Sequence, residues 1–521
     1  MLSAWGYVAG FALAVLVSAA VCGLLIPVAF RWRLVDRPGI RKTHRRAVAY
    51  LGGLGVLSGA GIAFAMLFRW LDLDARLGER LATLAACTLP ALGGLGLGLW
   101  DDVADLRPRY KFLIQASIAF AFSLFAYRLH ALHLPGFMPW PLDPVLGTLG
   151  TAFFMLALVN GFNMIDGSDG LCTGVSAASL AMVAVAAAGL EQPLVCLLAL
   201  VSSGACLGFL FWNRAPARMY LGDAGSQGLG FLVSALLLAL GNGLPGQDRS
   251  APWQPFHYHL LILTMLAGFP ALEVTLTVLR RGLQGRSLGR GDQGHLHHRL
   301  QRLGLRPSRI TLVAVAVNTL GGCMALAFLA AEKGLVVLLA LPMVVLLVLG
   351  LQQLGYTRIF KRRWVEERRP HYAIASHFGA MQAAKLTLVR DREEVLDLVG
   401  QACVELGAHE CRITVMDPRS EGGRWKWTWA APRGASEHPG RADHVRLAAI
   451  RAHASWILEL DEREPELDMN LRVIMGEFMR QALETLHKVM QGELQLKVVT
   501  GSKTDRPGGR SMSVRGLKRR I

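Results

Sequence analysis

The sequence predicts an α-helical polytopic membrane protein of about eleven transmembrane helices, followed by a small cytosolic α/β or α+β domain. Three observations predict this fold class. Apolar residues form 53% of the 521-residue chain, and charged residues form only 18%. The apolar residues gather in runs of about 20, the length of helix that crosses a hydrocarbon core of about 30 Å. These runs stop near residue 355, and the chain beyond that point is charged.

The first apolar run has no basic segment before it and is too long for the apolar part of a signal peptide. We therefore interpret it as a retained span. The later runs have similar lengths, so each is predicted to cross the membrane once. The predicted spans cover 7–29, 47–69, 81–99, 112–128, 144–160, 171–189, 193–212, 227–243, 258–279, 310–330 and 334–354.

Lys and Arg are unequally divided between the two sides that alternating loops define. Segments 30–46, 100–111, 161–170, 213–226 and 280–309 together contain 20 of them, and the opposite segments contain 6. Cytoplasmic loops are enriched in Lys and Arg, which predicts that the first set is cytoplasmic, the N-terminus outside and the C-terminus inside. The net charge of +17 is then explained by these loops and by a basic run after residue 357 that contacts lipid headgroups, with no nucleic-acid partner.

The chain changes character at residue 356. Residues 1–355 form the predicted transmembrane domain, 356–500 a cytosolic domain of unknown role, and 501–521 a disordered basic tail. In the cytosolic domain we expect helices at 391–407 and 467–490, with strands at 410–416, 424–430 and 454–460. The domain shows a faint similarity to GAF-type sensor modules. Docking of a regulator or pathway partner is one hypothesis for its role.

Acidic residues recur where the predicted spans meet the cytoplasmic loops. Asp101 and Asp102 end the third span, with Asp105 one turn later. Adjacent carboxylates disfavour each other unless a cation or a proton-transfer task compensates, although a solvated helix end would also explain them. Between the fifth and sixth spans, an Asp-Gly-Ser-Asp-Gly segment over 166–170 follows Asn160 and Asn163. It combines oxygen ligands for a hard cation with glycines that let backbone amides approach an anion.

Two further clusters carry the same kind of chemistry. Gly-Asp-Ala-Gly-Ser over 222–226 comes directly before a span, where a helix N-terminus favours an anion. His-Leu-His-His over 295–298 lies in a loop with eight basic residues. Three histidines in four residues would suit zinc, but no cysteine accompanies them, and the positive surroundings favour phosphate oxygens. The four clusters together predict a cytoplasmic site for a di- or polyphosphate substrate with Mg²⁺.

The order of these four motifs resembles that of the polyprenyl-phosphate N-acetylhexosamine-1-phosphate transferases, over residues 1–355. His-Leu-His-His is similar to the His-Ile-His-His of the bacterial undecaprenyl-phosphate GlcNAc-1-phosphate transferase branch, and unlike the Pro-x-His-His-His of the peptidoglycan branch. The first loop, 36–44 followed by Leu-Gly-Gly at 51–53, also resembles that branch. Two positions depart from the pattern. Gln293 stands where the family usually has a basic residue, and Ala49-Tyr50 where it has a proline. The first departure weakens one phosphate contact.

The resemblance implies an enzyme, a phosphotransferase that moves an N-acetylhexosamine-1-phosphate, foremost GlcNAc-1-phosphate, from a UDP-sugar to undecaprenyl or another polyprenyl phosphate. UMP is released, and synthesis of a lipid-linked cell-envelope polysaccharide begins at the bacterial inner membrane. The implied cofactor is Mg²⁺, with Mn²⁺ as the alternative, held by Asp223 and Asn163. Asp101 or Asp102 would deprotonate or orient the lipid phosphate, and Lys111 would pair with phosphate. The implied substrate-binding residues are Lys42, His44, Asp166, Asp169, Asn213, Arg290, His295, His297, His298 and Arg299.

Other interpretations stay open on the sequence alone. The donor could be UDP-GalNAc or UDP-MurNAc-pentapeptide. A membrane transporter would use carboxylates as an ion path near mid-membrane, whereas these lie at loop edges. A membrane receptor would use the cytosolic domain, but 356–521 contains no kinase-type nucleotide motif. The residues do not decide between direct displacement and a covalent phospho-enzyme. Homodimers are common in the resembled family, which makes a homodimer a further expectation.

Overall fold

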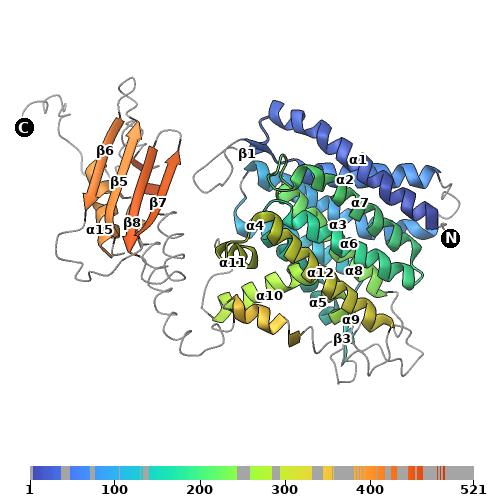
Figure 1. Cartoon of the computed structure of the whole chain (residues 1–521). Helices are drawn as coiled ribbons and strands as arrows, with labels where there is room; N and C mark the ends of the chain where they lie inside the picture. The colour runs from blue at the N-terminus through green and yellow to red at the C-terminus, as the bar shows by residue number, and fades with distance from the viewer. Residues whose placement is uncertain are drawn as a thin grey trace, which may run out of the picture. The chain divides into compact units, whose positions relative to one another are not determined.

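The chain divides into two compact units in the computed structural model, Met1–Ser376 and His377–Ile521. Figure 1 shows the helices of the first unit and the sheet of the second. The structure describes residues 4–36, 47–70, 77–104, 106–129, 131–132, 140–242, 259–283, 294–330, 344–345, 347–354, 356, 381–382, 384–386, 388–389, 391–405, 408–416, 424–430, 444–451, 454–461, 478, 481–482 and 485–486.

The first unit is almost entirely helical (Figure 1). Two short antiparallel pairs accompany the helices, β1 (Val35–Asp36) with β2 (Val48–Ala49) and β3 (Ala131–Leu132) with β4 (Trp140–Pro141). The helices are α1 (Ala4–Arg31), α2 (Gly52–Trp70), α3 (Leu77–Ala104), α4 (Pro108–Phe125), α5 (Pro144–Ile165), α6 (Leu171–Gly189), α7 (Pro193–Asn213), α8 (Gly222–Asn242), α9 (His259–Leu266), α10 (Gly268–Leu283), α11 (Leu296–Arg302) and α12 (Pro307–Ala330).

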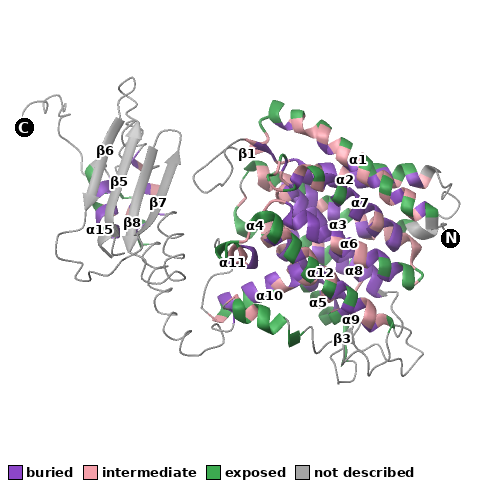
Figure 2. Cartoon of the chain, viewed as in Figure 1, coloured by how far each residue is buried: buried purple, intermediate pink, exposed green. Residues whose placement is uncertain are grey.

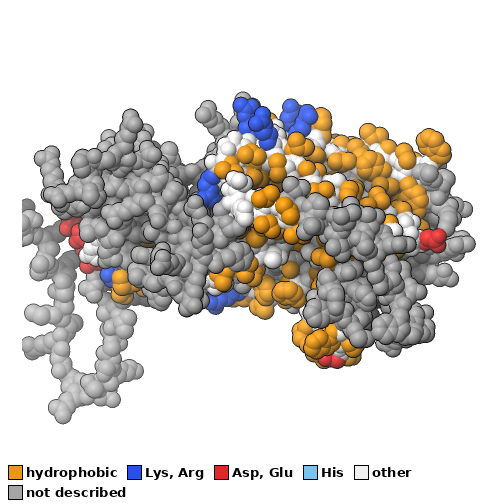
Figure 3. All heavy atoms as spheres, turned by 60° about the horizontal axis from the view of Figure 1, so that its bottom comes forward, with side chains coloured by type: hydrophobic (Ala, Val, Ile, Leu, Met, Phe, Trp, Pro, Cys, Tyr) orange, Lys and Arg blue, Asp and Glu red, His pale blue; other side chains and the backbone are white. Residues whose placement is uncertain are grey.

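Helix α8 lies at the centre of this unit. Its apolar stretch is entirely buried, and it packs against α2, α3, α5 and α6. The outer helices are different, because the apolar stretches of α1 and α12 are only 17% and 33% buried (Figure 2). They expose large side chains such as Leu16, Leu24 and Leu312, and hydrophobic side chains cover much of the described surface in Figure 3. A buried apolar centre with an apolar exterior indicates a multi-pass membrane protein.

Seven described helices are long and apolar enough to cross a membrane, or eight if one bent pair counts as a span. They correspond to the first, third, fifth to eighth and tenth predicted spans. Helices α2 and α4 lie at the second and fourth, and the apolar part of α2 is a shorter helix, Gly52–Phe68. The last predicted span, 334–354, lies partly outside the described residues. The count of eleven therefore stays a prediction.

The helix predicted over 258–279 is not continuous. Helices α9 and α10 meet at an angle of 105°. Pro270, near the start of α10, cannot donate a hydrogen bond into the preceding turn. The neighbouring amide of Phe269 instead donates to Asn318 Oδ1 at 3.1 Å. Asn318 is fully buried on α12, and its Nδ2 donates to Ser179 Oγ at 3.1 Å. A polar side chain from another helix thus stabilises the break, as bilayer-embedded backbone requires.

The second unit contains α15 (Arg392–Glu405) and a four-stranded antiparallel sheet. Its strands are β5 (Ala408–Met416), β6 (Arg424–Ala430), β7 (His444–Arg451) and β8 (Ala454–Asp461), in the spatial order β6-β5-β8-β7. The predicted strands fall at β5, β6 and β8, but β7 was not predicted. Its central run, Leu-Ala-Ala-Ile at 447–450, is continuously apolar and lacks the alternation that marks a strand. The helix predicted at 467–490 lies largely outside the described residues.

Candidate active site

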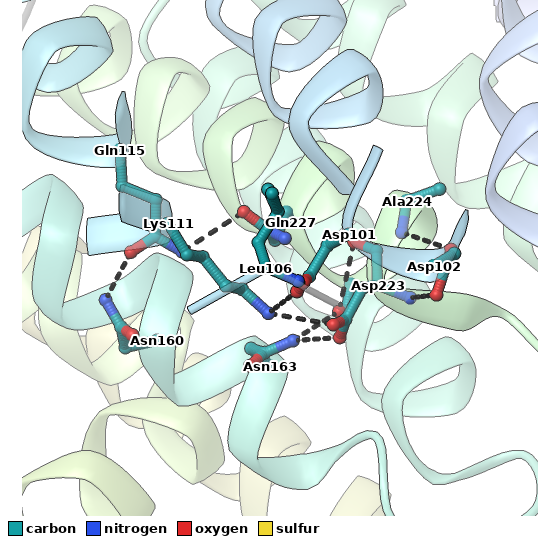
Figure 4. A network of polar contacts seen from close by, with 11 residues as sticks. Asp101, Asp102, Leu106, Lys111, Gln115, Asn160, Asn163, Asp223, Ala224 and Gln227 are labelled. Carbon is teal, nitrogen blue, oxygen red and sulfur yellow. Dashed lines mark hydrogen bonds and ion pairs between the residues drawn. The ribbon is translucent and has the colours of Figure 1, made fainter. Parts of the chain in front are cut away.

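Two carboxylates, those of Asp101 and Asp223, share the ammonium group of Lys111 (Figure 4). Lys111 Nζ lies 2.7 Å from Asp101 Oδ2 and 2.8 Å from Asp223 Oδ2. Asp101 is in the last turn of α3, Lys111 in the first turn of α4, and Asp223 in the first turn of α8. Three helix ends therefore meet at one end of the bundle. The shared cation offsets the repulsion between the two carboxylates.

Asn163, in the last turn of α5, completes this carboxylate cluster. Its Nδ2 donates to Asp223 Oδ1 at 2.6 Å and to Ser226 Oγ at 3.0 Å. Each oxygen of Asp223 thus has its own partner, the amide of Asn163 or the ammonium of Lys111. The structure brings together Asp101, Lys111, Asn163 and Asp223, which the sequence placed on four separate helices.

Asp102 has a different task from its neighbour, because it caps the start of α8. Its Oδ1 accepts from Asp223 N at 3.0 Å, and its Oδ2 accepts from Ala224 N at 3.1 Å. The first amides of a helix have no partner within the helix, and a carboxylate there also interacts favourably with the helix dipole. Successive side chains on a helix point about 100° apart, which explains why Asp101 and Asp102 meet different partners.

Glycines allow α8 to approach this closely. A Cβ atom on Gly98 of α3 would lie 2.2 Å from Asp223 O, and one on Gly53 of α2 would lie 2.1 Å from Gly225 N. Real Cβ atoms essentially never come within 3.0 Å of another heavy atom. The Leu-Gly-Gly motif of the first loop therefore provides a close backbone contact for the start of α8, and Gly98 does the same from α3.

A row of side-chain amides continues from the cluster into the bundle (Figure 4). Asn160 Nδ2 donates to Gln115 Oε1 at 3.2 Å, and Gln115 Nε2 donates to Gln227 Oε1 at 3.1 Å. Both glutamines are buried. The row joins α4, α5 and α8, so it fixes the rotation of the three helices that carry Lys111, Asn163 and Asp223. Sequence reasoning missed the two glutamines, although polar side chains inside predicted spans are a signal of such a role.

The loop between α5 and α6 is held by hydrogen bonds to its neighbours. Asp169 Oδ2 accepts from Ala217 N at 3.0 Å. Asn213, buried at the end of α7, accepts from Gly170 N at 3.1 Å and from Thr173 Oγ1 at 2.8 Å. Its Nδ2 donates to Met219 O at 2.9 Å. The side chains of Asp169 and Asn213, which the resemblance assigns to substrate, are thus engaged in holding this loop.

Asp166 is the residue of this loop that lies beside the carboxylate cluster. It follows the last turn of α5 directly. Burial raises the pKa of Asp166 well above its usual range, and the negative charges of Asp223 and Asp102 raise it further. Asp166 therefore lies within the electrostatic field of the carboxylate cluster.

His297 is the most deeply buried member of the histidine motif. It is 1% exposed on α11, and within the described part of the chain neither ring nitrogen has a hydrogen-bond partner. A Cβ on Gly167 would lie 2.5 Å from His297 Nε2, so the ring packs directly on the loop between α5 and α6. Burial lowers the pKa of His297 to about 3, with smaller contributions from His298 and His295. The histidine motif therefore lies against the loop that carries Asp166.

Glu273 of α10 anchors the histidine motif and was missed by sequence reasoning. It is fully buried, and its Oε1 lies 2.8 Å from His295 Nδ1. Its Oε2 accepts from Leu296 N at 2.9 Å. The signal was present, because Glu273 is a single carboxylate inside an otherwise apolar predicted span, and such residues are functional candidates by default.

Arg299 and Tyr356 fix the other end of this motif. Arg299 Nη1 donates to Leu354 O at 2.6 Å, and its guanidinium carbon lies 4.1 Å from the centre of the Tyr356 ring. Tyr356 OH donates to Gly294 O at 3.1 Å. The backbone at the end of the last predicted span is therefore attached to the histidine motif. Arg299, assigned to substrate by the resemblance, makes these contacts within the chain.

Three predicted substrate-binding residues, Lys42, His44 and Arg290, lie outside the described residues, as does the departure at Gln293. The other departure, Ala49-Tyr50, lies where β2 meets the segment before α8. Tyr220 N donates to Ala49 O at 2.7 Å, so the chain pairs here without the proline of the family pattern.

A hard cation would find two carboxylates and one amide in the cluster. Among the residues that the structure describes, no group of three or more His, Cys, Asp or Glu side chains is arranged to hold a metal ion. Mg²⁺ does not require such a group, because it keeps several water ligands and binds through one or two carboxylates and substrate phosphates. Asp223 supplies one such carboxylate, and Asn163, whose Nδ2 donates to Asp223, carries a side-chain oxygen that would be a neutral ligand beside it. The ammonium of Lys111 between Asp101 and Asp223 shows that the cluster stabilises positive charge.

Comparison with known proteins agrees with these motifs. The family model of glycosyl transferase family 4 matches residues 84–241, which include the carboxylate cluster. A Bacillus subtilis (strain 168) protein named probable undecaprenyl-phosphate N-acetylglucosaminyl 1-phosphate transferase is 28% identical over 319 residues, 60% of this chain and 82% of the relative. The undecaprenyl-phosphate alpha-N-acetylglucosaminyl 1-phosphate transferase of Escherichia coli (strain K12) is 27% identical over 305 residues, 56% of this chain and 77% of the relative.

A mycobacterial relative is similar at a higher level of identity. The decaprenyl-phosphate N-acetylglucosaminephosphotransferase of Mycolicibacterium smegmatis is 30% identical over 327 residues, 58% of this chain and 76% of the relative. The resemblance drawn from the motifs is thereby confirmed. The chain belongs to glycosyl transferase family 4, the family of the polyprenyl-phosphate N-acetylhexosamine-1-phosphate transferases.

Proposed function

We propose that this protein transfers GlcNAc-1-phosphate from UDP-GlcNAc to undecaprenyl phosphate or a similar polyprenyl phosphate and releases UMP. The observation that carries the proposal is the meeting of Asp101, Lys111, Asn163 and Asp223 at one end of an apolar bundle. A site at a helix-bundle end suits a substrate whose phosphate is polar and whose isoprenoid lies in lipid. The names of the bacterial relatives support GlcNAc as the sugar and a polyprenyl phosphate as the acceptor.

The reaction exchanges one phosphoanhydride bond for another. The lipid phosphate attacks the phosphorus next to the sugar, and UMP leaves with the bond electrons. The main barrier is the approach of two anions, so groups that position and neutralise phosphate supply most of the catalysis. In our proposal Lys111 pairs with the lipid phosphate, and Asp101 orients it or accepts its proton. Asp102 holds the start of α8 in place.

Mg²⁺, or Mn²⁺ as the alternative, is the proposed cofactor, with Asp223 and Asn163 as its protein ligands. When bound, it would neutralise pyrophosphate charge and stabilise the departing UMP. The support is the donor set of carboxylate and amide groups, which suits a hard cation. His295, His297 and His298 are proposed to contact the sugar-phosphate side of the donor, and Asp166 to shape the nucleotide side.

The proposed location is the bacterial inner membrane, with the site on the cytoplasmic face and the N-terminus outside. The excess of Lys and Arg in the segments that carry the motifs supports this orientation. A cytoplasmic site also has direct access to nucleotide sugars. A regulatory or docking role for the cytosolic unit and formation of a homodimer are proposals as well. Unchanged activity, abundance and glycan length after deletion of 365–521 would remove the regulatory role.

The decisive experiment measures release of labelled UMP from uridine-labelled UDP-GlcNAc by the purified protein with undecaprenyl phosphate and Mg²⁺. We expect lipid-dependent release that Asp223→Asn abolishes. The matched control is Glu191→Gln, which changes an exposed acidic residue in the loop after α6, far from the carboxylate cluster along the helices. Release only with UDP-GalNAc or UDP-MurNAc-pentapeptide would change the donor. No release with any UDP-sugar by the folded protein would refute the proposal.

A further inference from the structure

We propose that Glu273 is a positioning residue for the sugar-nucleotide side of the reaction, acting through His295. The inference deepens the proposed function and rests on it. The juxtaposition that carries it is a fully buried carboxylate on α10 that contacts both the first histidine of the motif and the backbone at the start of α11.

Both oxygens of Glu273 are occupied by donors from the chain. Oε1 faces His295 Nδ1 at 2.8 Å and accepts from Thr277 Oγ1 at 3.2 Å. Oε2 accepts from Leu296 N at 2.9 Å. A carboxylate with no exposed surface and two engaged oxygens does not touch a substrate. Its effect on the reaction must pass through the groups that it holds.

The contact determines which nitrogen of His295 carries a proton. A carboxylate only accepts hydrogen bonds, so Nδ1 must be the N–H that faces Oε1. The other nitrogen, Nε2, is then left to face a ligand in a fixed orientation. Carboxylate–histidine pairs of this kind set the tautomer and ring orientation of functional histidines elsewhere.

The orientation of His295 extends to the rest of the motif. The His295 and His297 rings are parallel to within 2°, with centres 5.8 Å apart, and the His297 and His298 ring centres are 4.1 Å apart. His297 in turn packs on Gly167, beside Asp166. A rotation of His295 would therefore disturb the surface where the histidine motif meets the loop between α5 and α6.

The bend between α9 and α10 explains how Glu273 reaches this position. A continuous helix through 258–279 would carry Glu273 along the direction of α9, whereas the 105° bend redirects α10. On α10, the buried polar residues Glu273, Thr277, Arg280 and Arg281 follow the spacing of one helix face. A Cβ on Gly294 would lie 2.5 Å from Arg280 Nη1, so this face also supports the residue before His295. Helix α10 is thus a platform for the motif.

The test is steady-state kinetics of Glu273→Gln in the full-length protein with UDP-GlcNAc and undecaprenyl phosphate. Gln keeps the shape but turns a donor toward His295 Nδ1 or leaves one bond unmade. We expect KM for UDP-GlcNAc to rise about tenfold, the change that the loss of about one hydrogen bond produces, while KM for the lipid stays within about twofold of the wild type. Glu191→Gln is the matched control and leaves both values unchanged.

A double-mutant cycle separates positioning from general structural damage. If Glu273 acts through His295, Glu273→Gln adds no more than about a twofold change to His295→Ala, because neighbouring residues in one network are not additive. Additive effects, or equal changes in both KM values, would overturn the inference.

A milder variant covers the case in which Glu273→Gln does not fold. Thr277→Val removes one donor to Oε1 without leaving a buried charge alone, and we expect KM for UDP-GlcNAc to rise about threefold. An active wild type with unchanged donor KM in the variants overturns only this inference. A folded wild type that is inactive with every UDP-sugar overturns the proposed function, and the inference falls with it.

Discussion

The close approach of α3 to α8 predicts that Gly98→Ala disables the enzyme. A Cβ at this position would lie 2.2 Å from Asp223 O and 2.4 Å from Ala224 N, against a practical minimum of 3.0 Å. The neighbours are backbone atoms, so they cannot turn aside as a side chain would. The two helices must separate by about 0.8 Å, a displacement of the size that costs an active site about a hundredfold in rate.

The separation acts directly on the cap that Asp102 provides. Its bonds to the amides of Asp223 and Ala224 measure 3.0 and 3.1 Å. Lengthened by about 0.8 Å, both would exceed the limit of about 3.2 Å for a good N–H···O bond. Each such bond to a charged group is worth about 1.5–3 kcal/mol, whereas Gly→Ala within a helix gains only about 1 kcal/mol. Gly98→Ala should therefore lower thermal stability as well as activity.

Gly96→Ala is the control, because it lies on the same helix and its Cβ would meet nothing within 4 Å. The assay is lipid-dependent UMP release, with the unfolding midpoint of each variant measured in the same detergent. We expect Gly98→Ala to lose about a hundredfold in kcat and to melt earlier, while Gly96→Ala keeps the activity of the wild type. Wild-type kcat in Gly98→Ala would refute the idea that this contact sets the position of Asp223.

Three further predictions concern other contacts. Lys111→Met should lower kcat at least about thirtyfold, because the cation shared by Asp101 and Asp223 is lost. The control is Arg109→Met, which changes an exposed residue on the same turn and should leave kcat unchanged. Equal kcat values in the two variants would contradict the role of the Lys111 ammonium. Burial lowers the pKa of His297 to about 3, so between pH 6.5 and 3 the unfolded chain binds a proton that the folded chain does not. The free energy of unfolding therefore decreases as the pH is lowered through this range. His297→Phe should remove about 2 kcal/mol of the loss between pH 7.5 and 5, measured by denaturant unfolding, and an unchanged loss would count against it. Tyr356→Phe removes the hydrogen bond to Gly294 O and should lower the free energy of unfolding by about 1 kcal/mol in the same assay. An unchanged free energy of unfolding would contradict a stabilising role for this bond.

The motifs of the sequence predicted the members of the carboxylate cluster, because each one stands at the end of a predicted helix. Alternating spans place the ends of α3 and α5 and the starts of α4 and α8 on one side. The sequence could not predict which carboxylate faces which partner. That Asp101 meets Lys111 while Asp102 caps α8 depends on the rotation of α3, which is set by glycine contacts such as that of Gly98.

Hydropathy predicts where an apolar helix lies along the chain, but it does not predict a change in the direction of the helix axis. The run over 258–279 has the composition of one span, but composition does not show a bend of 105°. The bend depends on a distant residue, Asn318, that satisfies the freed amide of Phe269. For the same reason Glu273 was read as part of an apolar span, although it anchors His295. The strand β7 was missed because its apolar run does not alternate.

The spacing of the charged cluster along the chain has a consequence for how the protein is made. Asp101 and Lys111 are ten residues apart, so their ion pair can form as soon as α3 and α4 have entered the membrane. Asp223 is 112 residues beyond Lys111, a delay on the order of 10 s at ordinary rates of translation. The first carboxylate and its ammonium therefore offset each other's charge at the membrane face before the second carboxylate is made. The second carboxylate, that of Asp223, joins the pair only when α8 is made, and α8 is the helix at the centre of the bundle.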